Sequence, residues 1–260
     1  MMTAFLFTGV PSTAAEDDFH CEVLSVEGKV LVTDSDGNER VLLEGDLLSA
    51  GDTVEAKEES SADIAFDKDW KNVTHIEEKS KMKIGAVSPG QVMLKTGGVF
   101  AKLKQLPKDS SFEVQTPTAV ATVRGTEYRT QFTDGQTQVF NVSPSSSTVI
   151  VCSVQADGKV NRDQPVVLAP ATKTQVPKVG ELPKEPVALT PEDTTATETI
   201  THKIETHIQT AVTAGRASKI QSVEDIQKAL KKPVLKKPDD GSELSRVIDA
   251  RRRPFKKTGE

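Results

Sequence analysis

Short runs of alternating apolar and polar residues, separated by turn residues, extend from residue 22 to about residue 176. Successive side chains of a strand point to opposite faces, so each alternating run predicts a half-buried strand. No helical spacing of apolar residues persists over a convincing length in this region. Many short strands with regular turn signals indicate an all-β domain.

Asp-Gly pairs locate two of the predicted turns. Such pairs tolerate positive φ and close tight turns between antiparallel strands. With Asp134-Gly135 at their centre, residues 128–142 predict a β-hairpin. Residues 148–168 predict a second pair of strands around Asp157-Gly158.

The pattern changes after Val176. Prolines at positions 177, 183, 186 and 191 predict an extended linker over residues 179–193, because proline supports neither helix nor sheet hydrogen bonding. Residues 194–214 then carry a four-residue apolar spacing that predicts one helix stripe. The stripe consists of Ile200, Ile204, Ile208 and Val212.

Beyond this helix, residues 222–230 and 242–248 predict two short helices, capped by Ser222 and Ser242, and Pro233 ends the first. Residues 231–260 hold ten basic and five acidic residues, an excess of five positive charges, although the whole chain has a net charge of -5. The predicted β domain is therefore acidic, which disfavours nucleic-acid binding by it. The basic end of the partly helical tail, residues 194–260, could contact an anionic polymer.

The first residues resemble an export signal. Residues 3–10 form an apolar stretch, and the small residues Thr13 and Ala15 precede an acidic segment, so residues 1–15 predict a signal peptide. No basic residue precedes the stretch, and the alternative is a frayed apolar N-terminus. Cys21 and Cys152 could pair in an oxidising compartment, but two separate buried thiols are the preferred interpretation.

Composition argues against several classes of function. Only 4% of the residues are aromatic, which disfavours a large aromatic substrate pocket, and no apolar run approaches the 18 residues of a membrane span. His202 and His207 fall on different faces of the predicted helix, which argues against a shared metal. Asp46 and Asp52 are interpreted as turn residues rather than calcium ligands. We therefore expect no catalytic site, cofactor or metal.

Residues 111–128 form the most informative segment, SFEVQTPTAVATVRGTEY. Its pattern predicts a strand, a corner at Pro117, and a second strand in which small residues let neighbouring backbones approach closely. Gly125 predicts a bulge or sharp bend. Arg124, just before it, could turn inward toward carbonyl or carboxylate oxygens; a partner-binding role for residues 124–126 is the alternative to a structural one.

This segment resembles the FecR domain family, whose typical pattern is FxVxTPxAxAxVRGTxF. The matching positions, which we interpret as structural, are Phe112, Thr116, Pro117, Ala119, Ala121, Val123, Arg124, Gly125 and Thr126. The resemblance implies an extracytoplasmic all-β domain over residues 16–178, built as a stack of short strands like a small β-solenoid. The best-known members sense outer-membrane iron–siderophore receptors and signal through a membrane helix to an anti-sigma segment; a stand-alone form without these elements is expected here.

Trp70, Lys71 and His75 lie near a turn that departs from the family pattern. An exposed Trp70 would make a natural partner contact, and the alternative is a tryptophan that caps the core. The sequence thus predicts a periplasmic or secreted, non-enzymatic module that binds an envelope protein or polysaccharide. One alternative is a component of cell-surface signalling related to iron–siderophore uptake, and a less favoured one is an envelope carbohydrate-processing enzyme.

Overall fold

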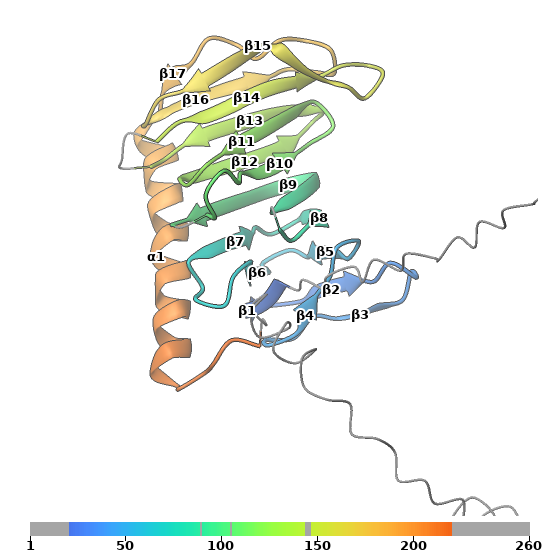
Figure 1. The fold of residues 1–260 in the computed structure, drawn as a ribbon, viewed down its shortest axis with the longest axis vertical. Helices are drawn as coiled ribbons and strands as arrows, with labels where there is room; N and C mark the ends of the chain where they lie inside the picture. Colours follow the sequence, from blue (N-terminus) through green and yellow to red (C-terminus); the bar gives the residue numbers. More distant parts are fainter. Residues whose placement is uncertain (1–20, 89, 105, 144–146, 220–260) are drawn as a thin grey trace, which may run out of the picture. The chain divides into compact units, whose positions relative to one another are not determined.

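The computed structural model describes residues 21–88, 90–104, 106–143 and 147–219. These residues form 17 strands followed by one helix, α1 (Pro191–Thr213), which confirms the predicted all-β class with a helix after it (Figure 1). The chain divides into two units, Met1–Gln221 and Ser222–Glu260, and every described residue belongs to the first. The predicted signal peptide, the two short helices after Ser222 and the basic end of the tail lie outside the described residues.

The 17 strands are joined by hydrogen bonds into one sheet that does not close. This sheet folds into two stacked layers, which we call sheet A and sheet B. In spatial order, sheet A consists of β4 (Leu47–Leu48), β1 (Cys21–Glu27), β6 (Ser61–Ala65), β7 (Asn72–Ile76), the second half of β9 (Gln91–Leu103), β12 (Glu127–Thr133), β13 (Gln136–Asn141), β16 (Thr172–Val176) and β17 (Val187–Ala188). Sheet B, in the same direction, consists of β3 (Glu39–Val41), β2 (Val30–Thr33), β5 (Thr53–Ala56), β8 (Ser80–Ala86), the first half of β9, β10 (Phe112–Gln115), β11 (Ala119–Val123), β14 (Val149–Val154) and β15 (Val160–Leu168).

Strand β9 passes from sheet B to sheet A at a glycine. Gly97 has φ +85°, a conformation that side chains disfavour, and a Cβ placed there would lie 2.1 Å from Ser80 Oγ and 2.5 Å from Ser80 Cα. The close approach of β8 therefore requires glycine at the corner. This corner joins the two layers in the middle of the stack.

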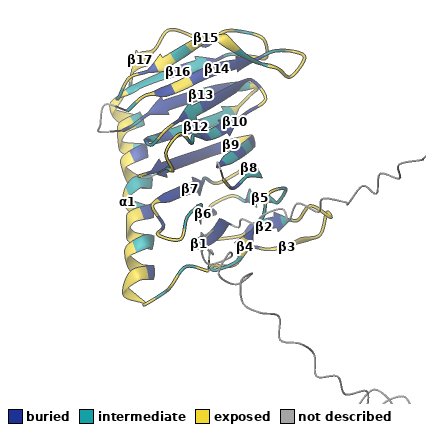
Figure 2. Cartoon of the chain, viewed as in Figure 1, coloured by how far each residue is buried: buried dark blue, intermediate teal, exposed yellow. Residues whose placement is uncertain are grey.

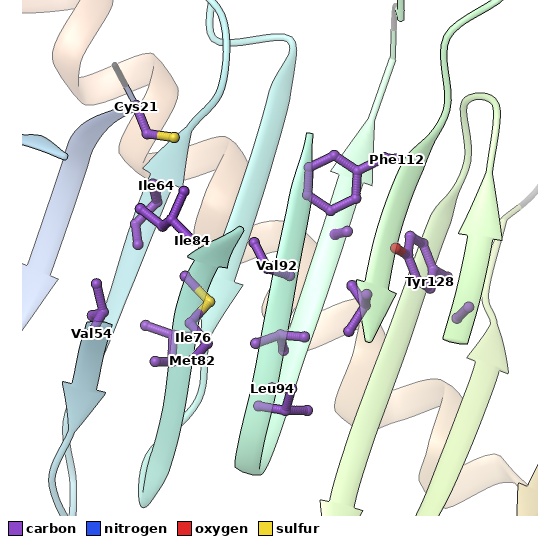
Figure 3. Close-up of a cluster of buried hydrophobic side chains, with 14 of the residues drawn as sticks. Cys21, Val54, Ile64, Ile76, Met82, Ile84, Val92, Leu94, Phe112 and Tyr128 are labelled. Atoms are coloured by element: carbon purple, nitrogen blue, oxygen red, sulfur yellow. The ribbon is translucent and has the colours of Figure 1, made fainter. Parts of the chain in front are cut away.

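The apolar core fills the space between the layers. Side chains such as Ile64, Met82, Val92 and Phe112 are fully buried there, and Figure 3 shows them converging from both sheets. In β2, β5 and β10 buried and less buried residues alternate, as the sequence pattern predicts, whereas β6 and β7 are buried at every position. Figure 2 shows the strands in the middle of the stack as mostly buried, with β3, β15 and β17 more exposed.

The two strand pairs around Asp-Gly turns are confirmed. Strand β12 pairs with β13 up to Thr133 and Gln136, and the turn residues Asp134 and Gly135 have φ of 53° and 77°. Two consecutive positive φ values match the right-handed twist of a tight hairpin. Strand β14 pairs with β15 across the second turn.

Helix α1 begins at Pro191, three residues before the predicted start at residue 194. Thr190 caps it: Thr190 Oγ1 accepts a hydrogen bond from the Asp193 amide at 3.2 Å, and Asp193 Oδ2 accepts one from the Thr190 amide at 2.8 Å. Proline follows at the first helical position, where its missing N–H costs nothing. Only part of residues 179–193 is extended linker, because this range also contains the short strand β17 and the first turn of α1.

The predicted apolar stripe of α1 is only partly buried against the sheet. Ile204 is buried and Ile200 and Ile208 are half-buried, but Val212 is 56% exposed and Ala211 is buried in its place. A spacing of four residues advances 40° per step around a helix, so the stripe rotates away from the sheet. Val212 therefore lies at the exposed end of the stripe. Among the described residues, no helix is long and apolar enough to cross a membrane.

Candidate functional site

Helix α1 lies across the outer face of sheet A, on the side opposite the core (Figure 1). Its apolar contact is a small cluster, in which Leu24, Ala65, Trp70, Val73 and Phe100 from the sheet side meet Ile204 and Ala211 of α1, with the half-buried Val142, Ile200 and Ile208 packed against them. Polar side chains supply most of the other attachments. The interface between α1 and sheet A is therefore the candidate site.

A buried carboxylate is the centre of this interface. Asp63 of β6 is fully buried, and its carboxylate accepts hydrogen bonds from His75 Nδ1 at 2.6 Å, His207 Nδ1 at 2.5 Å and Ser25 Oγ at 3.0 Å. His207 comes from α1, whereas the other residues come from neighbouring strands of sheet A. We call Ser25, Asp63, His75 and His207 the Asp63 cluster.

The cluster stabilises charged forms in spite of its burial. Burial alone would raise the pKa of Asp63, but the hydrogen bonds and charges of His207 and His75 outweigh it and hold that pKa well below the usual range. The hydrogen bond to Asp63 raises the pKa of His207, although partial burial opposes this shift. The Asp63–His207 contact therefore has the character of an ion pair between sheet and helix.

A second carboxylate extends the cluster toward solvent. Glu27 of β1 lies 3.3 Å from His207 Nε2 and 2.6 Å from Lys203 Nζ, and Lys203 also donates to Ser61 Oγ at 2.9 Å. Burial raises the pKa of Glu27, but Lys203 and His207 lower it to a net value below the ordinary one. Two positive groups of α1 thus face two negative groups of sheet A.

Arg216, just after α1, forms a second attachment. Its guanidinium lies 5.5 Å from the Trp70 ring centroid and donates to the Leu24 carbonyl at 2.9 Å and to Glu44 at 2.5 Å. Glu22 Oε2 accepts from Trp70 Nε1 at 3.4 Å and from Ser218 Oγ at 2.6 Å. A cation over an aromatic face adds to the ion pairs.

Two more ion pairs hold the rest of the helix. Lys102 of β9, which is buried, lies 2.6 Å from Glu205 of α1 and 3.1 Å from Glu127 of β12. At the start of α1, Lys173 of β16 lies 2.6 Å from Asp193. Sheet residues far apart in sequence therefore attach the helix along its whole length.

The residue types Ser25, His207 and Asp63 are those of a hydrolase triad, but their geometry differs. In a triad the aspartate and serine bond opposite nitrogens of the histidine, so that one nitrogen can take the serine proton. Here both side chains lie against Nδ1, Ser25 at 2.9 Å and Asp63 at 2.5 Å, and Nε2 faces Glu27. The arrangement suits attachment of α1 rather than proton transfer. Within the described part of the chain, no group of three or more His, Cys, Asp or Glu residues could hold a metal ion.

The proposed contact residues Trp70, Lys71 and His75 do not share one exposed surface. Trp70 is only 6% exposed and His75 is buried, whereas Lys71 is exposed and pairs with Asp69 at 3.3 Å. Trp70 has φ 53° in a turn whose amides bond to the Asp67 side chain, and it packs beneath α1. The expectation of an exposed Trp70 is therefore wrong, and the core-capping alternative describes its place.

The FecR-like motif forms a hairpin that ties the two sheets together. Thr116 Oγ1 accepts the Ala119 amide at 2.9 Å and so closes the turn at Pro117 between β10 and β11. Thr137 Oγ1 of β13 lies 2.6 Å from both Thr116 Oγ1 and Thr118 Oγ1. This buried chain of hydroxyls joins the turn, on sheet B, to sheet A.

The remaining motif positions also have structural places. Phe112, Ala119, Ala121, Val123 and Thr126 are buried. Gly125 has φ +138°, which turns the chain after β11 and directs Thr126 inward. Arg124 is exposed and so does not turn inward.

Other expectations concern turns and thiols. Asp46 Oδ2 and Asp52 Oδ2 each accept a backbone amide at 2.9 Å, from Leu43 and Ser49, which is the turn chemistry that the sequence predicts. Cys21 and Cys152 are free and buried, in agreement with the preferred interpretation. Burial raises the pKa of both thiols.

The sequence alone did not identify the Asp63 cluster. In the sequence, His207 stands out only as a metal-ligand candidate together with His202, and His202 is exposed in the structure. The available signal was Asp63 itself, an acidic residue in the middle of the otherwise small and apolar strand SADIA. A charge at such a position needs a partner.

A comparison with known protein families supports the resemblance to the FecR domain family in part of the chain. The family model described as "FecR protein" matches residues 52–143. The comparison with curated proteins gives no match. Two crystal structures from Parabacteroides distasonis ATCC 8503, both named "putative anti-sigma factor", at 1.65 and 2.50 Å, are similar at 15% identity and TM-score 0.43. The similarity covers 55% of this chain and 63% and 62% of theirs, so the chain spans less than two thirds of their length.

Proposed function

We propose that this chain, which carries an FecR domain at residues 52–143, is a non-enzymatic regulatory component of cell-surface signalling. In this proposal the β unit binds a protein partner, and the position of α1 on sheet A reports that binding to the rest of the chain. The connection to iron–siderophore uptake comes from the family resemblance.

One observation carries the proposal: the matched segment contains sheet residues that attach α1. Asp63, His75, Lys102 and Glu127 all lie within residues 52–143, and all four face the helix side of sheet A. A partner that shifts these strands would change the attachments of α1 directly. This arrangement favours regulation over a passive interaction module.

The finer parts of the proposal rest on the sequence. Export to the periplasm or outside the cell follows from residues 1–15, and contact with an anionic envelope polymer follows from the basic residues after 230. Binding rather than catalysis is supported by the geometry at Ser25 and His207, which does not suit proton transfer.

The test is a comparison of transcripts from cells that carry the gene, lack it, or carry Asp63→Asn. We expect loss of the gene to change one coherent set of genes, and we expect Asp63→Asn to change the same set because it weakens the attachment of α1. A matched control is Asp36→Asn, which alters an exposed turn residue. An unchanged transcript profile, together with turnover of an envelope glycan by the purified protein, would contradict the proposal and favour the enzyme.

A further inference from the structure

We propose that α1 is a releasable strap, held on sheet A by a protonated His207 against buried Asp63 and released when that proton is lost. This inference rests on the geometry of the interface and holds whatever partner the protein binds. It assigns a switching role to a residue that neither the family match nor the motif includes, since His207 lies outside residues 52–143.

The apolar contact of α1 is too small to hold the helix firmly by itself. Of its 23 residues only Thr197, Ile204 and Ala211 are buried, Ile200 and Ile208 are half-buried, and Figure 2 shows the helix largely exposed. Most surface helices dock through a wider apolar face. The attachment of α1 therefore depends strongly on its polar contacts, which respond to charge.

The charged groups that face His207 determine how the docking of α1 responds to pH. From the sheet, the titratable or charged groups are Asp63, His75 and Glu27, and from α1 the nearest is Lys203. With His207 protonated, two positive groups of α1 face the two carboxylates. Without that proton, Lys203 alone faces them, and the fully buried Asp63 loses its charged partner on the helix.

The direction of the pH dependence follows from the shifts. Because docking raises the pKa of His207, protonation and docking favour each other. Docking is complete below the ordinary histidine pKa and weakens as pH rises through the raised value. Each unit of difference between the docked and released pKa changes the docking equilibrium about tenfold. Asp63, whose pKa is held low, would weaken docking only in strong acid.

The single tryptophan of the chain provides a direct probe. Trp70 is buried beneath α1 and contacts Arg216, so release of the helix exposes its ring to water. We expect the emission of the full chain to shift to longer wavelength as pH rises from the ordinary histidine pKa of about 6.5 through the raised pKa of His207. Circular dichroism over the same range should show that the strands remain folded.

Two substitutions separate His207 from other titrating groups. His207→Gln should give long-wavelength emission without a pH transition, since glutamine carries no proton to lose. His202→Gln, on an exposed face of the same helix, should behave like the natural chain. The proposal is overturned if the natural chain shows no transition, if His207→Gln keeps the same transition, or if α1 stays docked in His207→Gln at every pH.

Discussion

Replacing Asp63 by asparagine removes the charge at the centre of the helix–sheet interface with almost no change in volume. Asp63 accepts hydrogen bonds from three side chains and is fully buried. Asparagine presents an amide to at least one donor, so a donor faces a donor and the protonated His207 loses its counter-charge. Removing one partner of a buried ion pair costs about 3–5 kcal/mol. Because α1 can leave the sheet and let water reach His207, we expect the free energy of unfolding to fall by about 3 kcal/mol, the lower end of this range.

The assay is equilibrium unfolding in urea near neutral pH, followed by circular dichroism. The midpoint should fall, and the slope should fall too to the extent that α1 has already left the sheet in the folded state, because less surface is then exposed on unfolding. Asp36→Asn, on the exposed turn between β2 and β3, serves as the control and should leave the midpoint unchanged. A midpoint of Asp63→Asn equal to that of the control would refute the argument that this carboxylate holds α1.

The pH dependence of the same variant tests whether the Asp63 carboxylate stabilises the protein in its charged form. The low pKa of Asp63 contributes stability above its unfolded pKa of about 3.9, and this stability is lost as pH falls toward the folded value. We expect Asp63→Asn to be less stable than the natural chain near neutral pH and the difference to shrink in acid. A difference that grows as pH falls would contradict the assignment.

Three further substitutions test other parts of the structure. Gly97→Ala should lower the free energy of unfolding in urea by more than about 2 kcal/mol, because it combines a positive φ with a clash against β8. Gly37→Ala, which has a positive φ but open space around it, should lower it by about 1 kcal/mol. Equal losses would contradict the conclusion that β9 requires glycine where it passes between the sheets. Tyr128→Phe should change the unfolding free energy by less than about 1 kcal/mol or increase it, because the buried hydroxyl has no partner among the described residues; a larger loss would imply a partner for that hydroxyl. Arg216→Ala should shift Trp70 emission to longer wavelength with a small effect on the strands, and unchanged emission would show that the cation does not cover the ring.

The local parts of the fold could be predicted from the sequence. The Asp134-Gly135 turn fixes the β12–β13 hairpin, because both turn residues adopt positive φ and the partners are adjacent in the chain. The start of α1 was also encoded locally, in the capping box of Thr190 and Asp193, although proline content obscured it. Such signals depend on neighbours within a few residues.

The candidate site could not be predicted in the same way, because its parts are distant in sequence. His207 and Asp63 are separated by 144 residues, and Trp70 is buried by a helix that begins more than a hundred residues later. An acidic residue within an apolar strand indicates that a partner exists but does not identify it. Only the stacking of β1, β6 and β7 with α1 brings the four groups of the cluster together.

Hydrogen exchange of the α1 amides, compared at about pH 6 and about pH 8.5 after correction for intrinsic rates, tests the central claim most directly. If protonated His207 holds the helix on sheet A, α1 exchanges slowly at the lower pH and much faster at the higher pH, while β7, β9 and β12 remain protected at both. Equal protection of α1 at the two pH values, or loss of protection in helix and strands together, would contradict the account.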